Sequence, residues 1–176
     1  MKRSLPDEII LGLLKARPSH GYDLLEVFRS KSYLGQSWTM STSQLYAVLK
    51  RLNREALITG TEIDSPNAPS RVEYAITPHG EAKLLAWLYE PNPSSSIFRI
   101  RLLFLSRIFI ANLLELPCEE IVSAQIMACE AQKAIFLTRL TSCDSDFVRL
   151  TINFVINQLD AATNWLNASN FDVAIN

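Results

Sequence analysis

Apolar residues recur every three or four positions in the first part of the chain, which is the spacing of the buried face of an amphipathic helix. The first such stretch begins at residues 5–8, and its apolar positions are Ile9, Ile10, Leu13 and Leu14. The second opens at Ser19 or His20, and its core face is predicted to hold Tyr22, Leu24, Leu25 and Phe28. Residues 33–40 are expected to form a connection. A third helix is predicted to begin at Ser41, within the stretch 41–58, with its apolar stripe at Leu45, Val48, Leu49 and Leu52.

The third helix carries the strongest start signal in the chain. Ser41 and Gln44 form the S-x-x-Q capping box, in which each side chain bonds the backbone N–H of the other residue. Met40 before the cap and Leu45 after it have the spacing of a hydrophobic staple. We therefore expect a well-defined helix that begins directly after Ser41.

The opposite face of this helix is small and hydroxylic at its start and cationic further along. It is made of Ser43, Ala47, Lys50 and Arg54, with Arg51 adjacent. Such a face suits a DNA groove, because hydroxyls and the helix N-terminus meet phosphates or base edges while Lys and Arg neutralise the backbone. The simpler alternative is an ordinary solvated helix face.

A different pattern follows, with alternation and β-branched residues at 57–63 and 71–76. These two stretches are predicted to be strands, and the turn-forming residues 64–70 between them predict a β-hairpin with a long tip. Thr77-Pro78 then starts another helix. Three helices followed by a hairpin make a winged helix-turn-helix, in which the third helix enters the major groove of DNA and the hairpin reaches the neighbouring backbone or minor groove.

The proline- and serine-rich stretch 91–96 is the predicted boundary between two domains, 1–90 and 97–176. The second domain is expected to contain antiparallel helices at about 97–115, 117–141 and 145–168, so that the protein as a whole is mainly α with a small β-hairpin wing. The last helix is apolar on two stripes. One stripe is Phe147, Leu150, Phe154, Ala161 and Trp165, and the other is Val148, Ile152, Val155, Leu159 and Leu166. Two apolar stripes need burial on two sides, which predicts a homodimer through these helices.

Charge and cysteine content limit the functional classes. The net charge is −1, and residues 1–90 hold 11 basic and 10 acidic residues, so any DNA-binding surface must be local. Three widely spaced cysteines form no metal motif and no disulfide framework. The start of the chain lacks a secretory pattern, and arginines interrupt the longest apolar run, 97–114. These features predict a soluble, cytoplasmic protein without a membrane span, metal or cofactor.

An enzyme is disfavoured by the same residues. The chain has two histidines, His20 and His79, both in turn-like settings, and it has no glycine-rich phosphate loop and no nucleophile elbow. Cys118 is expected near a helix N-terminus, where the pKa of a thiol can fall, but no base accompanies it. A winged helix that binds protein instead of DNA remains an alternative, because residues 1–90 are nearly neutral in charge. The salt dependence of binding separates these two functions, since phosphate contacts weaken as the salt concentration rises.

Several separate segments resemble the PadR-type family of transcriptional regulators, in the family's order along residues 5–90. They are 9–14 as the opening helix, 18–24 with its His-Gly-Tyr turn, 45–52 as the recognition helix, 57–58 as the start of the wing and 71–80 as its closing signature. The C-terminal helices resemble those of the family's longer branch. The family usually carries glycine where this chain has Ala56, which implies a different helix exit or a small strain there.

This resemblance implies a regulator, usually a repressor, that binds double-stranded operator DNA as a homodimer and is in some members released by a small aromatic molecule. Two-fold symmetry predicts a pseudo-palindromic operator. The DNA contacts that the resemblance implies are His20, Tyr22, Ser41, Thr42, Ser43, Tyr46, Lys50 and Arg71, with Arg51 and Arg54 as further phosphate contacts.

Other roles are open for several of these residues. Tyr46 can pack under its helix, His20 can serve as a cap, and Arg71 can pair with Glu62 or Glu73 across the hairpin. Trp38 and Trp165 are candidate platforms for a planar effector, although core packing is the simpler role for each.

Overall fold

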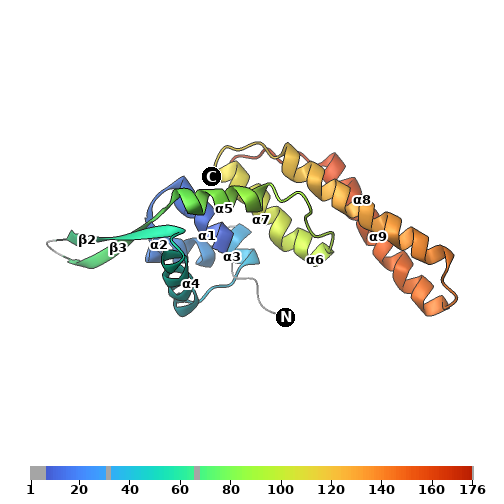
Figure 1. The fold of residues 1–176 in the computed structure, drawn as a ribbon, viewed down its shortest axis with the longest axis horizontal. Helices are drawn as coiled ribbons and strands as arrows, with labels where there is room; N and C mark the ends of the chain where they lie inside the picture. Colours follow the sequence, from blue (N-terminus) through green and yellow to red (C-terminus); the bar gives the residue numbers. More distant parts are fainter. Residues whose placement is uncertain (1–6, 31–32, 66–67, 176) are drawn as a thin grey trace. The chain divides into compact units, whose positions relative to one another are not determined.

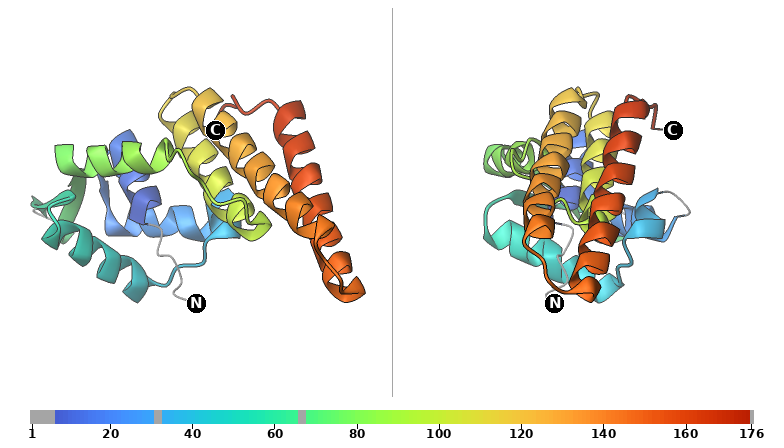
Figure 2. Two further views of the ribbon diagram at one scale, coloured as in Figure 1. Left: turned by 45° about the vertical axis from the view of Figure 1, so that its right-hand side comes forward. Right: turned by 90° about the vertical axis from the view of Figure 1, so that its right-hand side faces the viewer.

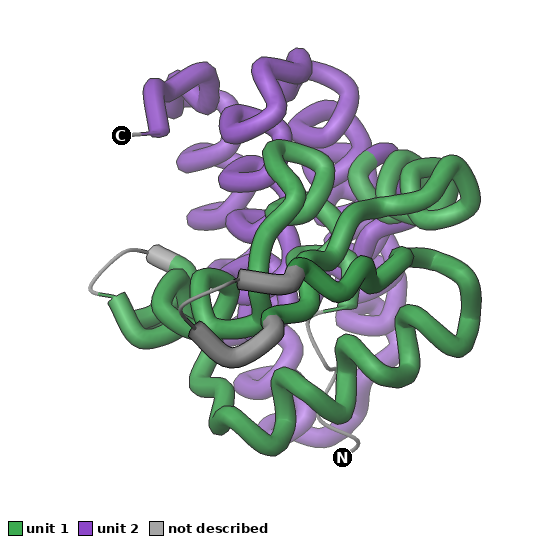
Figure 3. Tube along the Cα trace, turned by 90° about the vertical axis from the view of Figure 1, so that its left-hand side faces the viewer, with its two compact units in different colours: residues 1–88 green, residues 89–176 purple. Residues whose placement is uncertain are grey.

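The computed structural model describes residues 7–30, 33–65 and 68–175, without the side chains at 33, 64, 65 and 68–70. The chain divides into two compact units, residues 1–88 and 89–176, which are coloured separately in Figure 3. None of the helices in the described ranges is long and apolar enough to cross a membrane.

The N-terminal unit combines a helical core with a small antiparallel sheet (Figure 1). Its elements are α1 (Asp7–Ala16), β1 (Ser19–His20), α2 (Gly21–Arg29), α3 (Tyr33–Ser37), α4 (Thr42–Arg54), β2 (Ile58–Ser65), β3 (Ala68–Ile76) and α5 (Pro78–Leu88). The predicted apolar stripes of α1 and α4 are buried as expected, and Leu84 and Leu88 of α5 join the same core. The prediction of a mainly α winged-helix fold is confirmed.

The start of α2 differs from the prediction. Ser19 and His20 form a short strand that pairs with β3 through Tyr74 and Glu73, so α2 itself begins at Gly21. Two residues are too short to show an alternating pattern, and only their partners on β3 identify the strand. Tyr22 was expected in the core with Leu24, Leu25 and Phe28, but its side chain is 63% exposed. It lies in the first turn of α2, where the phenol reaches solvent.

Two connections also differ. Residues 33–37 of the expected connection form α3, a helix of one turn that buries Leu34. The wing strands extend into the predicted tip, because β2 continues to Ser65 and β3 starts at Ala68. Residues 66 and 67 lie outside the described range. The sheet order is β1-β3-β2, with Ile58 opposite Ile76 and Ile63 opposite Arg71.

Helix α4 has well-formed ends. The Ser41 hydroxyl accepts from the Gln44 N–H at 3.2 Å, and the Ser41 N–H donates to the Gln44 carbonyl oxygen Oε1 at 2.9 Å, which confirms the capping box. Helix α4 ends at Arg54, because the chain turns back there. Leu57 N–H donates to Leu52 O and Ala56 N–H donates to Asn53 O, which is the Schellman arrangement.

Ala56 is the residue that this arrangement places in the left-handed region, with a φ of 55°. The sequence predicted either a different helix exit or a small strain at Ala56, and the structure shows the strained conformation. Glycine favours this conformation because it has no Cβ.

The C-terminal unit is entirely helical in its regular elements. They are α6 (Ile97–Arg99), the π-helical segment η1 (Ile100–Phe104), α7 (Leu105–Leu113), α8 (Glu119–Thr141) and α9 (Asp146–Ala168). The stretch predicted as one regular helix over 97–115 is therefore interrupted by a wider turn at 100–104. Helices α8 and α9 run side by side as an antiparallel pair (Figure 2).

Helix α9 separates its two apolar stripes. Ile152, Ile156, Leu159 and Leu166 are buried. The other predicted stripe stays exposed, with Phe147 at 75%, Leu150 at 65% and Phe154 at 61%. Val148, expected on the inner stripe, is also exposed because it lies in the first turn of α9.

Candidate nucleic-acid interface

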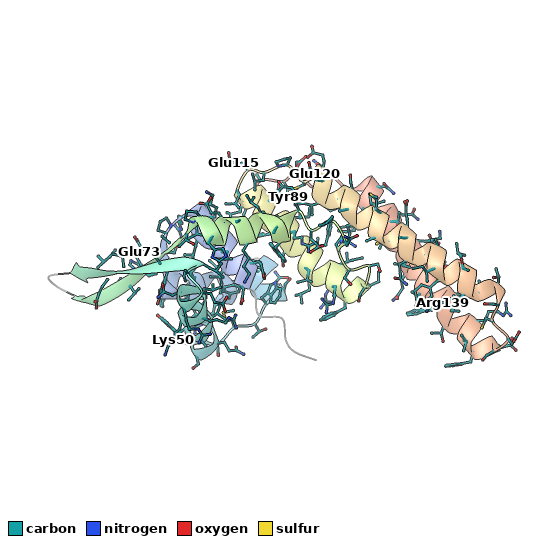
Figure 4. All side chains as sticks on the ribbon, in the orientation of Figure 1. Lys50, Glu73, Tyr89, Glu115, Glu120 and Arg139 are labelled. Carbon is teal, nitrogen blue, oxygen red and sulfur yellow. The ribbon has the colours of Figure 1, made fainter. Side chains whose placement is uncertain are left out.

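The outer face of α4 is free of packing along its length. Ser43, Ala47, Lys50 and Arg54 are all exposed, while the opposite stripe is buried. Figure 4 shows Lys50 projecting from α4, and Glu73 on the wing strand β3. Helix α4 therefore presents hydroxyl and cationic groups on one surface, with its N-terminal N–H groups at one end.

Two residues near this surface make side-chain contacts with other helices of the N-terminal unit. The Arg51 guanidinium pairs with the Asp7 carboxylate of α1, so Arg51 lies on the flank of α4 that faces the core. Burial raises the pKa of Asp7, and the positive charge of Arg51 opposes this rise. Thr42 accepts a hydrogen bond from Arg29 Nη2 at 3.1 Å, which ties the start of α4 to the end of α2.

A hollow of about 580 Å³ lies beside α4, between the start of α2 and the wing. Its lining residues are His20, Gly21, Tyr22, Asp23, Tyr46, Arg71, Val72 and Tyr74. The fold thus brings together four of the residues assigned to DNA contact from three separate segments. A cation, an imidazole and three phenols converge there, and these groups donate hydrogen bonds to anionic oxygens.

Tyr46 closes one side of this hollow. Its side chain is 47% exposed, so the alternative role of Tyr46, packing under α4, is not the one observed. A Cβ on Gly21 would come within 2.9 Å of the Tyr46 hydroxyl and 3.0 Å of its ring, which shows how closely α2 and α4 approach. The absent side chain at Gly21 is what allows the phenol to lie against the first turn of α2.

His20 and Arg71 lie at the wing side of the hollow. His20 caps α2, and its Nδ1 is 3.1 Å from the Val72 carbonyl oxygen. The register of β2 and β3 puts Arg71 opposite Ile63, and Glu62 opposite Val72. Because side chains alternate between the faces of a strand, Arg71 shares a face with Glu73 and not with Glu62.

Comparison with known proteins agrees with this geometry. Residues 10–86 match the family model described as Transcriptional regulator PadR-like family. That range covers almost the whole N-terminal unit. The matched part of this unit, here termed the PadR-like domain, is similar to that family.

Two relatives share the PadR-like domain. The chain is 34% identical over 84 residues to the negative transcriptional regulator PadR of Bacillus subtilis, and 30% identical over 88 residues to the probable transcriptional regulator Rv1176c of Mycobacterium tuberculosis. The matches cover 48% and 50% of this chain and 45% of each relative. The chain thus aligns with less than half the length of these relatives. The matched family is described as one of transcriptional regulators, and no enzyme is among these relatives.

Two solved structures resemble most of the chain, at lower sequence identity. One is Bacillus subtilis PadR in complex with operator DNA, with 22% identity, a TM-score of 0.46 and coverage of 96% of this chain and 97% of that chain. Another is smu.1604c from Streptococcus mutans, with 21% identity, a TM-score of 0.47 and coverage of 93% and 97%.

The two tryptophans have different surroundings. Trp38 is 8% exposed, just before α4, and it offers little surface to a ligand. Trp165 is 41% exposed in the C-terminal unit and makes edge-on contacts with Phe104 and Phe171, at centroid distances of 6.0 and 5.2 Å. The two rings belong to separate units.

Four lining residues of the hollow were not assigned to the site from the sequence, and two of them, Tyr74 and Asp23, carry polar side chains. Tyr74 lies on β3, and burial, with a smaller effect of Tyr46, raises the pKa of its phenol. Asp23 accepts from the His20 N–H at 3.3 Å. The spacing of Asp23 three residues after the cap was a usable signal, because an acid at that position completes a helix start. Tyr74 had no such signal, since a tyrosine in a strand is ordinary.

Proposed function

We propose that this protein is a sequence-specific DNA-binding transcriptional regulator that acts as a homodimer on a pseudo-palindromic operator, in the manner of a repressor. The observation that carries the proposal is the joint surface made by the outer face of α4 and the adjoining hollow. In it, Ser43 and Lys50 face the major groove, and Tyr46, Arg71 and the start of α2 meet the phosphates.

Each protomer would supply one recognition helix. The contacts in this proposal are His20, Tyr22, Ser41, Thr42, Ser43, Tyr46, Lys50, Arg54 and Arg71. Arg51 contributes by holding α4 to α1 through Asp7, and not by direct contact. The exposed stripe of α9 supports the dimer, because its aromatic side chains need cover that a second copy supplies.

The test is a titration of the protein against DNA from its own upstream region at two salt concentrations. We expect tight binding to one segment, with affinity that falls steeply as salt rises. Lys50→Ala should weaken this binding about tenfold, since it removes one charged contact per protomer.

The matched control is Lys15→Ala. Lys15 is also an exposed lysine, but its ammonium pairs with Glu81 of α5 at 2.8 Å and is not presented on α4. This variant should bind like the unchanged protein. Equal loss in both variants, or binding no tighter than to random DNA, would reject the proposed surface and favour the protein-binding alternative.

Release by a small aromatic molecule is the last part of the proposal. Trp165 is its site, because its ring is partly exposed within an aromatic cluster. Small planar aromatic molecules should quench Trp165 fluorescence and lower DNA affinity together. Quenching that is unchanged in Trp165→Leu would remove this part of the proposal.

A further inference from the structure

His20 has a hydrogen bond that determines which of its ring nitrogens carries the proton. Nδ1 lies 3.1 Å from the carbonyl oxygen of Val72. A carbonyl oxygen only accepts hydrogen bonds, so Nδ1 must be the donor and must carry hydrogen. In the neutral ring the other nitrogen, Nε2, then has a lone pair and no hydrogen.

Nε2 makes no hydrogen bond within the described part of the chain, and His20 lines the hollow beside α4. A DNA phosphate offers only acceptor oxygens. A neutral His20 would therefore place a lone pair against an acceptor, which is unfavourable. Protonation converts Nε2 into a donor and adds a positive charge, and both changes favour a phosphate.

The surroundings contain groups of both signs. The ionisable groups around His20 on α2, α4 and β3 are Asp23, Glu73, Arg71, Tyr22, Tyr46 and Tyr74. The carboxylates are negative and the guanidinium is positive, so charges of both signs are in balance around the ring. The phenols are neutral near pH 7. A phosphate entering the hollow adds negative charge, and so it tips this balance toward protonation.

We propose that binding of DNA by this protein takes up a proton at His20, so that affinity for the operator increases as pH falls from 8 to 6. This inference rests on the proposed function, because the phosphate that completes the site belongs to DNA. Histidine is the side chain whose charge changes in this pH range. His20 thus keeps its hydrogen bond to Val72 at either pH and becomes a cationic phosphate ligand at low pH.

The experiment measures operator affinity at constant ionic strength between pH 6 and pH 8. Linkage sets the limit at about tenfold per pH unit for each proton taken up. His20→Asn is the informative variant, because its amide can still donate to the Val72 carbonyl and asparagine is a good N-cap, but it does not titrate. It should bind more weakly at pH 6 and lose the pH dependence.

His79→Asn is the matched control, since His79 is the other histidine of the chain and is exposed at the start of α5. It should keep both the affinity and the pH dependence. Circular dichroism at pH 6 and 8 checks that each variant is folded.

A second measurement does not require that the His20→Asn variant folds. The two histidine ring signals in the NMR spectrum, assigned with His79→Asn, report protonation directly. We expect the titration midpoint of His20 to move to higher pH when operator DNA is bound, while that of His79 stays in place.

The outcomes separate the two proposals. Tight, salt-dependent binding that is equal at pH 6 and 8, or pH dependence that persists in His20→Asn, would overturn proton uptake and leave the DNA-binding function intact. A midpoint for His20 that does not rise would do the same. Loss of specific binding at every pH would overturn both.

Discussion

A cysteine at a helix start is activated or silenced by what surrounds it, and Cys118 shows the second case. It caps α8, where the helix dipole was expected to lower the pKa of the thiol. The structure corrects this expectation. Burial first, and then the Asp172 carboxylate of the C-terminal tail, raise the pKa of Cys118 to about 11. Burial also raises the pKa of Cys129.

The three thiols should therefore differ in reactivity. At pH 8 we expect iodoacetamide to modify Cys143, which is partly exposed, well before Cys118 or Cys129. Thiolate is the reactive form, and the raised pKa values keep the thiols of Cys118 and Cys129 protonated. Mass spectrometry of timed digests measures the order. In urea all three should react at similar rates. Fast labelling of Cys118 in the folded protein would contradict the prediction that its thiol is buried and unreactive.

The raised pKa of Cys118 also sets a sign for stability against pH. A group whose pKa is higher in the folded state contributes stability at low pH and loses it as pH rises through the folded value. This contribution is therefore present at neutral pH and is lost as pH rises toward about 11.

At the scale of an element, the two ends of α4 differ. The local sequence determines the N-terminal end, whereas the C-terminal end requires a backbone conformation that its residue disfavours. The capping box at Ser41 needs only residues within one turn, and it formed as predicted. The exit at Ala56 needs a left-handed residue because Leu57 must turn back into the core, where it is 2% exposed. Tertiary packing thus imposes a conformation that alanine disfavours.

Ala56→Gly should consequently stabilise the protein by about 1 kcal/mol, because it removes the left-handed penalty of a Cβ. The urea midpoint of unfolding measures this change. Ala47→Gly is the control, since the same substitution at an exposed position inside α4 should destabilise by about 1 kcal/mol. Destabilisation by both would show that the exit at residue 56 is relaxed.

At the scale of the whole molecule, the exposed stripe on α9 is the surface on which the proposed homodimer rests. Phe147, Leu150 and Phe154 lie along one side of a helix whose other side is already packed. Met127 of α8 is also exposed, at 69%. A contiguous apolar surface of this kind marks an interface, and a dimeric regulator needs one to present two recognition helices.

Phe154→Glu should dissociate the proposed dimer, because it places a charge in the middle of the stripe. Sedimentation velocity should show a dimer for the unchanged protein and a monomer for the variant, with operator affinity reduced by tenfold or more. Asn153→Glu adds the same charge at an exposed neighbour off the stripe and should remain dimeric. A Phe154→Glu protein that sediments as a dimer would assign the interface elsewhere.

The sequence by itself determined the features that rest on neighbours along the chain. The stripes of α1 and α4, the capping box, the wing strands and both stripes of α9 depend on spacing within an element, and periodicity is a local property. The exposed cations of α4 follow from the same spacing, because the face opposite a buried stripe must face outward.

Tertiary structure alone decided what depends on segments that meet in space. It paired Ser19 and His20 with β3, turned Tyr22 outward, joined Arg51 to Asp7, and buried Cys118 beside Asp172. It also assembled the hollow from α2, α4 and β3, and gave His20 the Val72 carbonyl that selects its tautomer. These contacts join residues as many as 55 positions apart, Ser19 and Tyr74, and no local pattern encodes such a partner.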